Sequence, residues 1–254
     1  MIYVILPIYN EASALTSLIT KIKSTLSTTQ LSYKIIAVDD GSRDDSPQIL
    51  KRFSLHIPLE IITHKINRGL GETLRDGFEY VADVSGDLDV IVSMDADGTH
   101  DPVVILKMLG KIKEGYNVVI ASRYANGGAE KGLTLKRVVF SKVANLIMKV
   151  SFPVKGLRDY SCGYRAYQAS TIKSAIAFYG NNFIELKGLG FTATPEMLVK
   201  LIRFKAKITE VPFVLRYDLK SGKSKMVSYE TIIGYFILVF KNFIKNRRLK
   251  PQRL

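Results

Sequence analysis

The clearest chemical signal in this chain is a pair of carboxylates one residue apart. The segment VIVSMDADGTHDP places Asp95 and Asp97 on a turn directly after an apolar run. Such a pair can ligate Mg²⁺ or Mn²⁺, because these cations prefer oxygen donors and share their shell with phosphate oxygens. An ordinary Asp-Gly turn is the simpler alternative. The position after a buried strand favours a metal site, with His100 as a third ligand or as a hydrogen-bonded neighbour.

A second acidic pair, Asp39 and Asp40, ends the apolar run in IIAVDDGSRDDS. Carboxylates at this place can accept hydrogen bonds from nucleobase N–H groups or ribose hydroxyls. A turn in which Asp44 or Asp45 lies near a helix cap is the alternative. Ligands of open α/β sheets bind outside the carboxyl ends of the strands, so both acidic pairs are expected to face one crevice.

The elements that must position these residues alternate along the first half of the chain. Strand-like runs occupy residues 2–6, 33–38, 59–63, 90–94 and 118–121, and amphipathic helical patterns occupy residues 14–26, 47–53, 71–81 and 103–112. The runs IIAV and VIV are apolar on both faces, as a helix-covered parallel sheet requires. This predicts an α/β fold with a doubly wound, mostly parallel sheet. Helices at 136–150 and 195–204 should complete the crevice rather than form a second domain.

Length and composition exclude several classes of protein. A chain of 254 residues with 47% hydrophobic residues fits one globular domain, with or without an appendage. The only cysteine, Cys162, excludes an intrachain disulfide and a cysteine-rich zinc module, and it is expected to be a small packed residue. The N-terminal apolar run breaks at Pro7 without a basic leader, so no export is expected.

The net charge of +14 indicates an anionic partner, which could be a phosphorylated lipid, a membrane surface or nucleic acid. No helix-turn-helix, RNA-binding aromatic pair or zinc motif accompanies the charge, so nucleic acid is not expected. No GxGxxG follows the first strand, which argues against a dehydrogenase.

The C-terminal segment YETIIGYFILVFKNFIK is strongly apolar and ends in basic residues. Its uncharged core, residues 231–240, is shorter than the ~20 residues that span a bilayer as a helix. Apolar side chains flanked by lysines and arginines predict an interfacial helix whose charges meet lipid phosphates. A core helix, or a helix at a homo-oligomer interface, is the alternative. The expected division is a main α/β domain over residues 1–227 and a membrane-associating tail over residues 228–254.

Seven motifs occur in order: LPIYNE, VDDGS, NRGLG, DADGTHDP, ASRY, GYRAY and EVPFVLRYDLKSGKSKM. Together, over roughly residues 2–227, they resemble family 2 glycosyltransferases of the GT-A fold, and most closely the dolichol-phosphate mannose synthases and their polyprenyl-phosphate relatives. The resemblance implies metal-dependent, inverting transfer of a hexose to a polyprenyl or dolichyl phosphate, by a peripheral protein at the cytoplasmic membrane face. Mannose from GDP-mannose is the first candidate donor, and UDP-glucose is the alternative. The implied cofactor is Mg²⁺ or Mn²⁺.

The same resemblance implies roles for single residues. The nucleotide pocket would comprise Pro7, Tyr9, Glu11, Val38, Asp39 and Asp40. The metal and diphosphate would be held at Asp95, Ala96 and Asp97. Further donor or phosphate contacts would come from Arg123, from Lys225, and from either Arg216 or Lys220.

Two departures from the family pattern leave the donor sugar open. Thr99 stands where relatives usually have Gln, and Thr192 stands where they have Lys. A membrane scaffold with a degenerate site is the corresponding non-enzymatic alternative.

The acceptor decides whether the reaction needs a base. A polyprenyl phosphate is already anionic and needs none, whereas a glycan hydroxyl needs a carboxylate within hydrogen-bond reach. Asp159 is the candidate base, with an ion pair to Arg158 or Arg165, or a turn cap, as its alternative role.

Overall fold

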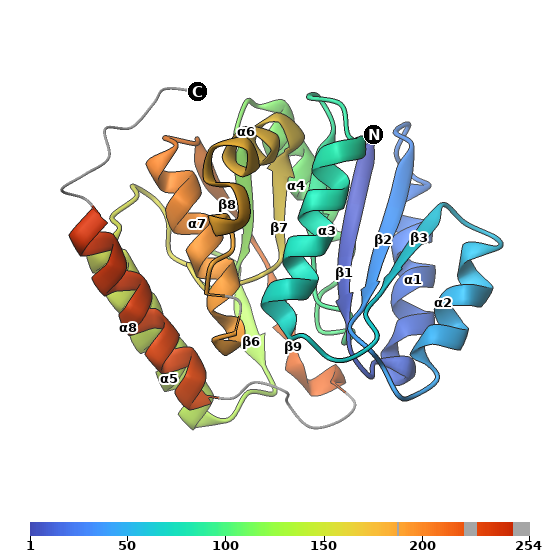
Figure 1. Cartoon of the computed structure of the whole chain (residues 1–254), viewed down its shortest axis with the longest axis horizontal. Coiled ribbons are helices and arrows are strands. Elements are labelled where there is room, and N and C mark those ends of the chain that lie inside the picture. Colours follow the sequence, from blue (N-terminus) through green and yellow to red (C-terminus); the bar gives the residue numbers. More distant parts are fainter. Residues whose placement is uncertain (187, 221–227, 246–254) are drawn as a thin grey trace.

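The computed structural model describes residues 1–186, 188–220 and 228–245. Over these residues the chain forms a seven-stranded sheet with helices on both faces, and a small two-stranded sheet beside it (Figure 1). The strands of the large sheet lie in the order β3-β2-β1-β4-β7-β5-β8. Their bounds are β1 Ile2–Ile8, β2 Tyr33–Asp39, β3 Leu59–Thr63, β4 Val90–Ser93, β5 Val118–Ser122, β7 Arg165–Gln168 and β8 Ile208–Pro212.

All the expected helices are present, and the structure adds one that was not expected, α6 (Ala169–Tyr179). Those expected at 14–26, 47–53, 71–81, 103–112, 136–150 and 195–204 have ends that differ from the expected ones by a few residues. Their bounds are α1 Ala12–Leu26, α2 Ser46–Ser54, α3 Leu70–Val84, α4 Val104–Lys113, α5 Leu135–Ser151, α6 Ala169–Tyr179, α7 Ala193–Arg203 and α8 Ser228–Lys245. The predicted doubly wound α/β fold is therefore confirmed.

The sheet topology places the crevice between β1 and β4. The chain builds β1, β2 and β3 toward one edge and then returns to place β4 on the other side of β1, with all three pairings parallel. Strand order reverses at this point, and ligands of open α/β sheets bind there. Both strands are buried along almost their whole length, so the turns that follow them are held by the core. Burial of each Ile or Val side chain contributes about 1.5–3 kcal/mol to that core.

One strand runs against the others. The segment RDYSCGYRAY, for which no strand was expected, contributes β7, which pairs antiparallel with both β4 and β5. Because β7 runs antiparallel to β4, residues 157–164, just before β7, lie at the same end of the sheet as the turn after β4. Ser93 donates a hydrogen bond to the carbonyl of Gly163 at 2.8 Å, which joins the two segments.

The small sheet orders the glycine-rich segment 126–132. Strand β6 (Ala129–Lys131) pairs in parallel with β9 (Val214–Arg216). Two glycines permit the close approach: a Cβ on Gly128 would lie 2.5 Å from the Ser122 carbonyl oxygen, and one on Gly132 would lie 2.4 Å from the Asp218 nitrogen. The pairing places residues 217–220 beside the crevice.

The expected tail helix, α8, packs on the domain instead of extending from it. It lies alongside α5 and contacts the 3₁₀ turn Gly190–Thr192 (Figure 1). Thr231, Tyr235 and Leu238 are buried, whereas Phe236 and Phe240 are 61% and 66% exposed. Within the residues that the structure describes, no helix is both long and apolar enough to cross a membrane.

Candidate active site

Two adjoining cavities open at the carboxyl ends of β1 and β4. The larger cavity, about 620 Å³, is lined by the turns after β1, β2 and β4 and by residues 67–70. The smaller cavity, about 200 Å³, lies between the turn after β4, residues 161–163, α5 and α8. Both are lined by Asp95, Asp97 and Lys220. The acidic pair predicted to bind a metal therefore lies at the junction of the two cavities.

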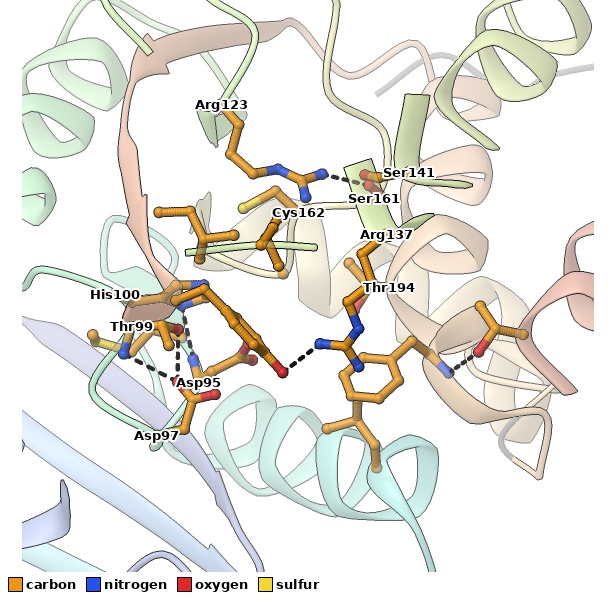
Figure 2. A pocket seen from close by; sticks show the side chains of 18 of the residues that line it. Asp95, Asp97, Thr99, His100, Arg123, Arg137, Ser141, Ser161, Cys162 and Thr194 are labelled. Atoms are coloured by element: carbon orange, nitrogen blue, oxygen red, sulfur yellow. Dashed lines mark hydrogen bonds and ion pairs between the residues drawn. The ribbon is translucent and has the colours of Figure 1, made fainter. Parts of the chain in front are cut away.

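The acidic pair is held in place by its own turn (Figure 2). The Thr99 hydroxyl donates to Asp97 Oδ1 at 2.6 Å, and the Thr99 backbone N–H donates to the same oxygen at 3.1 Å. The backbone N–H of Asp95 donates to His100 Nδ1 at 3.0 Å, and the His100 ring stacks on Tyr164. Thr99 thus orients the Asp97 carboxylate, and His100 fixes the backbone of Asp95, which matches the hydrogen-bonded neighbour expected as its alternative role.

The negative charge of these carboxylates favours the binding of a cation. Desolvation and the neighbouring charge of Asp97 raise the pKa of Asp95 despite the opposing effect of His100. The pKa of Asp97 is lowered, because His100, Lys220 and the Thr99 hydroxyl outweigh its desolvation. Lys220 Nζ donates to Asp97 Oδ2 at 2.5 Å and supplies one positive charge.

The donor set fits a divalent ion that is completed by substrate. Among residues 1–186, 188–220 and 228–245, no three His, Cys, Asp or Glu side chains gather where they could hold a metal by themselves. Mg²⁺ is commonly bound through one or two carboxylates together with substrate phosphates and water. Asp95 and Asp97 are a pair of this kind.

Asp159 does not have the surroundings of a general base. Its carboxylate is fully buried and accepts hydrogen bonds from Arg123 Nε at 2.7 Å and Arg123 Nη2 at 2.8 Å. It also accepts the backbone N–H groups of Arg123 and Cys162. Although burial opposes ionisation, the Arg123 guanidinium lowers the pKa of Asp159. The ion pair expected with Arg158 or Arg165 is formed instead with Arg123, and the carboxylate is saturated with donors.

Arg123 reaches the smaller cavity with its guanidinium fixed on several sides. Besides Asp159, it contacts Glu130 at 3.1 Å and donates to the Ser161 hydroxyl at 2.6 Å. Its side chain is 10% exposed and lines the smaller cavity. The residue predicted to contact the donor or its phosphates is thus presented next to the acidic pair.

Arg137 is a further cation of this site, and the sequence did not single it out. It lies in the first turn of α5, lines the smaller cavity, and donates to the Tyr217 hydroxyl. Figure 2 shows its guanidinium pointing toward the side of the cavity that holds the acidic pair. A basic residue at the start of an amphipathic helix is common on protein surfaces, so only the packing of α5 against the crevice reveals its place.

Most of the predicted nucleotide pocket lines the larger cavity. Its lining includes Pro7, Tyr9, Glu11, Asp40, Asp95, Ala96, Asp97 and Lys220. Val38 and Asp39 are exceptions: Val38 is buried within β2, and Asp39 Oδ1 accepts the Ser42 N–H at 3.1 Å inside the turn. Three residues of the NRGLG motif, for which no role was expected, also line this cavity: Asn67, Arg68 and Gly69. Gly188, Phe191 and Glu230 line it as well, and no sequence motif indicated them.

The structure separates the two candidate cations after β9. Lys220 lines both cavities, whereas Arg216 lines neither and forms an exposed ion pair with Asp218 at 2.8 Å. Arg216 is therefore not a site residue in this structure, because its β9 position directs it to the surface. Lys225 lies outside the described residues.

Two small residues have packing roles. The Thr192 hydroxyl donates to the Leu189 carbonyl at 2.5 Å and lies under Gly234 of α8, away from both cavities. Burial raises the pKa of the Cys162 thiol to about 12. The thiol is accordingly unreactive at neutral pH, as expected for a packed cysteine.

The comparison with protein families decides the classification. A family model described as glycosyl transferase family 2 matches residues 3–174. The chain belongs to glycosyl transferase family 2.

Individual relatives agree with the family. The chain is 31% identical over 239 residues to a dolichol-phosphate mannosyltransferase of Pyrococcus furiosus, covering 94% of this chain and 62% of that protein. It is 28% identical over 225 residues to a polyprenol monophosphomannose synthase of Mycolicibacterium smegmatis, covering 88% and 80%. This chain spans less than two thirds of the Pyrococcus protein. The activity of that whole protein is therefore not assigned to this chain from the match.

A solved structure confirms the fold. Glucosyl-3-phosphoglycerate synthase from Mycobacterium tuberculosis, determined with Mn²⁺, UDP and phosphoglyceric acid, superimposes with a TM-score of 0.61 at 19% identity. The match covers 94% of this family 2 chain and 78% of that one. The GT-A fold implied by the motifs is therefore confirmed.

Proposed function

We propose that this chain transfers a hexose from a nucleoside diphosphate sugar to a polyprenyl phosphate. The observation that carries the proposal is the position of Asp95 and Asp97 between a larger cavity whose lining includes several charged side chains and a smaller cavity with cationic and apolar walls. A donor and an acceptor placed in these cavities would meet at the acidic pair. Mannose from GDP-mannose is the first candidate donor, because relatives named for mannose transfer match most of this chain.

The larger cavity is the proposed donor site. Asp95 and Asp97 would hold Mg²⁺ or Mn²⁺, and the ion would neutralise the diphosphate as it departs. Lys220 adds a positive charge at the same place, since its Nζ lies 2.5 Å from Asp97 Oδ2. Fixed cations next to a developing charge stabilise the transition state without any rearrangement.

The smaller cavity is the proposed site of the acceptor phosphate. Its polar wall carries the guanidinium groups of Arg123 and Arg137 and the hydroxyl groups of Ser141 and Ser161. Guanidinium groups suit a phosphate because they can donate parallel hydrogen bonds, and Arg137 is the group placed to do so. Arg123 contributes mainly its charge, since its Nε and Nη2 donate to Asp159 and Ser161 and its Nη1 lies 3.1 Å from Glu130. The phosphate oxygen is already anionic, so it can attack the anomeric carbon without a base.

The lining of this cavity disfavours a glycan hydroxyl as the acceptor. Among the described residues that line it, the carboxylates are Asp95 and Asp97, which belong to the proposed metal site. Asp159 lies behind Arg123 with both oxygens occupied. A hydroxyl acceptor would therefore lack a carboxylate able to take its proton.

The apolar walls suit an isoprenoid chain. Phe140, Ala144 and Tyr235 line the smaller cavity and also an adjoining apolar groove of about 220 Å³ between α5 and α8. The remaining groove residues are Val143, Ile147, Ile232 and Phe236. A lipid whose phosphate lies at Arg123 and Arg137 would find a continuous apolar path outward.

The same two helices are the proposed membrane-binding surface. Five apolar residues of α5 and four of α8 are exposed, namely Leu135, Val139, Val143, Leu146, Val150, Ile232, Ile233, Phe236 and Phe240. Exposed apolar side chains on adjacent helices, in a chain of net charge +14, fit peripheral binding to anionic lipid. We place this surface on the cytoplasmic face of the membrane.

The test is a transfer assay with purified protein, polyprenyl phosphate vesicles and Mg²⁺ or Mn²⁺. Labelled GDP-mannose and UDP-glucose are compared, with Asp97→Asn as the inactive variant and the exposed Asp218→Asn as the matched control. We expect metal-dependent label in the lipid from one donor, reduced at least ~100-fold by Asp97→Asn. Label that is absent with both donors, although the nucleotides bind, would contradict the proposal.

A further inference from the structure

Arg137 is held in the smaller cavity by a phenol and not by a carboxylate. Its Nη1 donates to the hydroxyl of Tyr217, and its guanidinium carbon lies 5.0 Å from the centre of the Tyr217 ring (Figure 2). Over the part of the chain that the structure describes, no carboxylate forms an ion pair with Arg137. A hydroxyl can fix a guanidinium without offsetting its charge, whereas a carboxylate at the same place would offset it. The charge of Arg137 therefore remains available to a ligand.

Arg123, the other guanidinium of this cavity, has different surroundings. Its donors are engaged by Asp159 and Ser161, and Glu130 lies 3.1 Å away. Arg137, in contrast, lies in the first turn of α5, which contains no acidic residue. The helix dipole is positive at this end, so it adds to the charge of Arg137 and favours an anion. Arg137 is thus the cation of this cavity that is best placed to receive one.

Tyr217 is itself tied to the turn that carries the acidic pair. The backbone N–H of the preceding residue, Arg216, donates to the Thr99 carbonyl at 3.2 Å. The same Thr99 donates its hydroxyl to the acidic pair. On the other side, the following residue packs against Gly132, where a Cβ would lie 2.4 Å from the Asp218 nitrogen. Backbone contacts on both sides therefore set the position of Tyr217 relative to the acidic pair.

A second cation lies over the Tyr217 ring. Lys220 Nζ is 5.6 Å from the ring centre, and Lys220 lines both cavities. The face of an aromatic ring attracts cations, so the ring contributes to the placement of Lys220 as well as of Arg137. The hydroxyl, in contrast, accepts its hydrogen bond from Arg137. Tyr217→Phe therefore separates the two contacts, because it keeps the ring near Lys220 and removes the hydrogen bond to Arg137.

We propose that Tyr217 is a positioning residue that holds the Arg137 guanidinium in the smaller cavity, with its charge available, at a fixed place relative to the acidic pair. The inference rests on the proposed function, because it takes this cavity as the site of the acceptor phosphate. Arg137 is the group that contacts the phosphate, and Tyr217 acts through it. Without the hydroxyl, the guanidinium is less ordered, and ordering it on binding costs conformational entropy.

The first test measures the affinity for geranyl phosphate, a soluble isoprenyl phosphate, by calorimetry. We expect Tyr217→Phe to bind it about three- to tenfold more weakly than the wild type, because the hydrogen bond that orders Arg137 is lost. Affinity for GDP and UDP with Mg²⁺ should stay within about twofold, since the ring near Lys220 is kept. The matched control is Tyr116→Phe, at a half-buried tyrosine outside both cavities, which should keep both affinities.

A double-mutant cycle separates positioning from direct contact. Arg137→Met removes the guanidinium and leaves no donor for the Tyr217 hydroxyl. In this background, Tyr217→Phe should change the affinity for geranyl phosphate by less than about twofold, because the group that Tyr217 holds is gone. An equal loss in both backgrounds would show that Tyr217 contacts the phosphate itself and would overturn the proposal. Wild-type affinity in Tyr217→Phe would also overturn it.

Turnover gives a second readout. With the better donor, Tyr217→Phe should raise the KM for polyprenyl phosphate about three- to tenfold, while kcat and the donor KM stay within about twofold. If neither donor supports transfer, the proposed function fails, whereas the geranyl phosphate cycle still decides the role of Tyr217. A wild-type protein that does not bind geranyl phosphate at millimolar concentration would overturn the inference, whether or not transfer occurs.

Discussion

At the scale of single residues, burial determines what a carboxylate can do. Sequence motifs singled out both Asp159 and Asp97 as candidate site residues. In the structure, Asp159 is buried against Arg123, whereas Asp97 lines two cavities. The sequence located both residues correctly near the crevice. It could not distinguish them, because the partner of a buried carboxylate depends on segments that are distant in the chain.

Replacement of Asp159 by Asn should destabilise the fold. Removing one partner of a buried ion pair costs about 3–5 kcal/mol, because the Arg123 charge stays behind. Its folded pKa is lowered from 3.8, so this stabilisation is present above that value and is lost as the pH falls through the lowered one. Urea unfolding at pH 7 and below pH 4 should show a large difference from wild type that shrinks in acid. A difference that stays constant with pH would contradict the ion pair, and Asp218→Asn provides the exposed control.

Arg137 should contribute to the binding of the acceptor and not to the binding of the donor. Arg137→Gln removes a guanidinium from the smaller cavity, so the KM for polyprenyl phosphate should rise about 10- to 100-fold while nucleotide affinity is unchanged. Steady-state kinetics and calorimetry provide the two readouts. The exposed neighbour Lys136→Gln is the matched control. Equal weakening of both substrates would count against separate cavities.

At the scale of elements, most of the long periodic segments were predicted, whereas the helix α6 and the short inserted strand β7 were not. The buried strands and amphipathic helices carry their pattern within one segment, as in β1 and α3. β7 has four residues and begins with Arg165, a fully buried arginine that donates to the carbonyls of Thr194 and Tyr160. Such a strand is specified by its neighbours β4 and β5, and no local periodicity indicates it.

The close contact between α8 and the domain gives a prediction for Gly234. A Cβ at this position would lie 2.0 Å from Thr192 Oγ1, so Gly234→Ala should displace α8 and destabilise the protein by about 1–3 kcal/mol. Activity should fall as well, since Thr231 and Tyr235 of α8 line the smaller cavity.

Gly110 of α4 is the matched control for Gly234. A Cβ added at Gly110 would meet no neighbouring segment within 4 Å, so Gly110→Ala should stabilise the helix by about 0.5–1 kcal/mol. Thermal unfolding measures both variants. A neutral Gly234→Ala would show that α8 is not packed against Thr192.

At the scale of the whole molecule, nine exposed apolar residues lie on the adjacent helices α5 and α8, where the smaller cavity and the apolar groove also lie, while the others are distributed over the rest of the described surface. The sequence predicted an apolar basic tail but not its pairing with α5. The pairing depends on tertiary packing, because α5 has an unremarkable amphipathic pattern. The motif series alone gave the family and the GT-A fold, which the family model and the solved structure confirm.

The combined variant Phe236→Ser/Phe240→Ser should weaken binding to anionic vesicles at least ~10-fold, since each buried Phe contributes about 1.5–3 kcal/mol. Vesicle sedimentation measures this, and Leu88→Ser, which is 88% exposed before β4, is the control. Unchanged vesicle binding together with an altered oligomeric state in gel filtration would instead make this surface a homo-oligomer interface.

The most direct measurement of the central claim compares two lipids that differ only in the acceptor group. Labelled donor and metal are supplied with polyprenyl phosphate or with the corresponding polyprenol, in the same vesicles. Since the described lining of the smaller cavity offers guanidinium groups but no carboxylate outside the acidic pair, we predict label only in the phosphate lipid. Equal transfer to the alcohol would contradict the account, because it would require a general base: the two carboxylates of this lining belong to the proposed metal site, and His100 Nδ1 already accepts the Asp95 N–H.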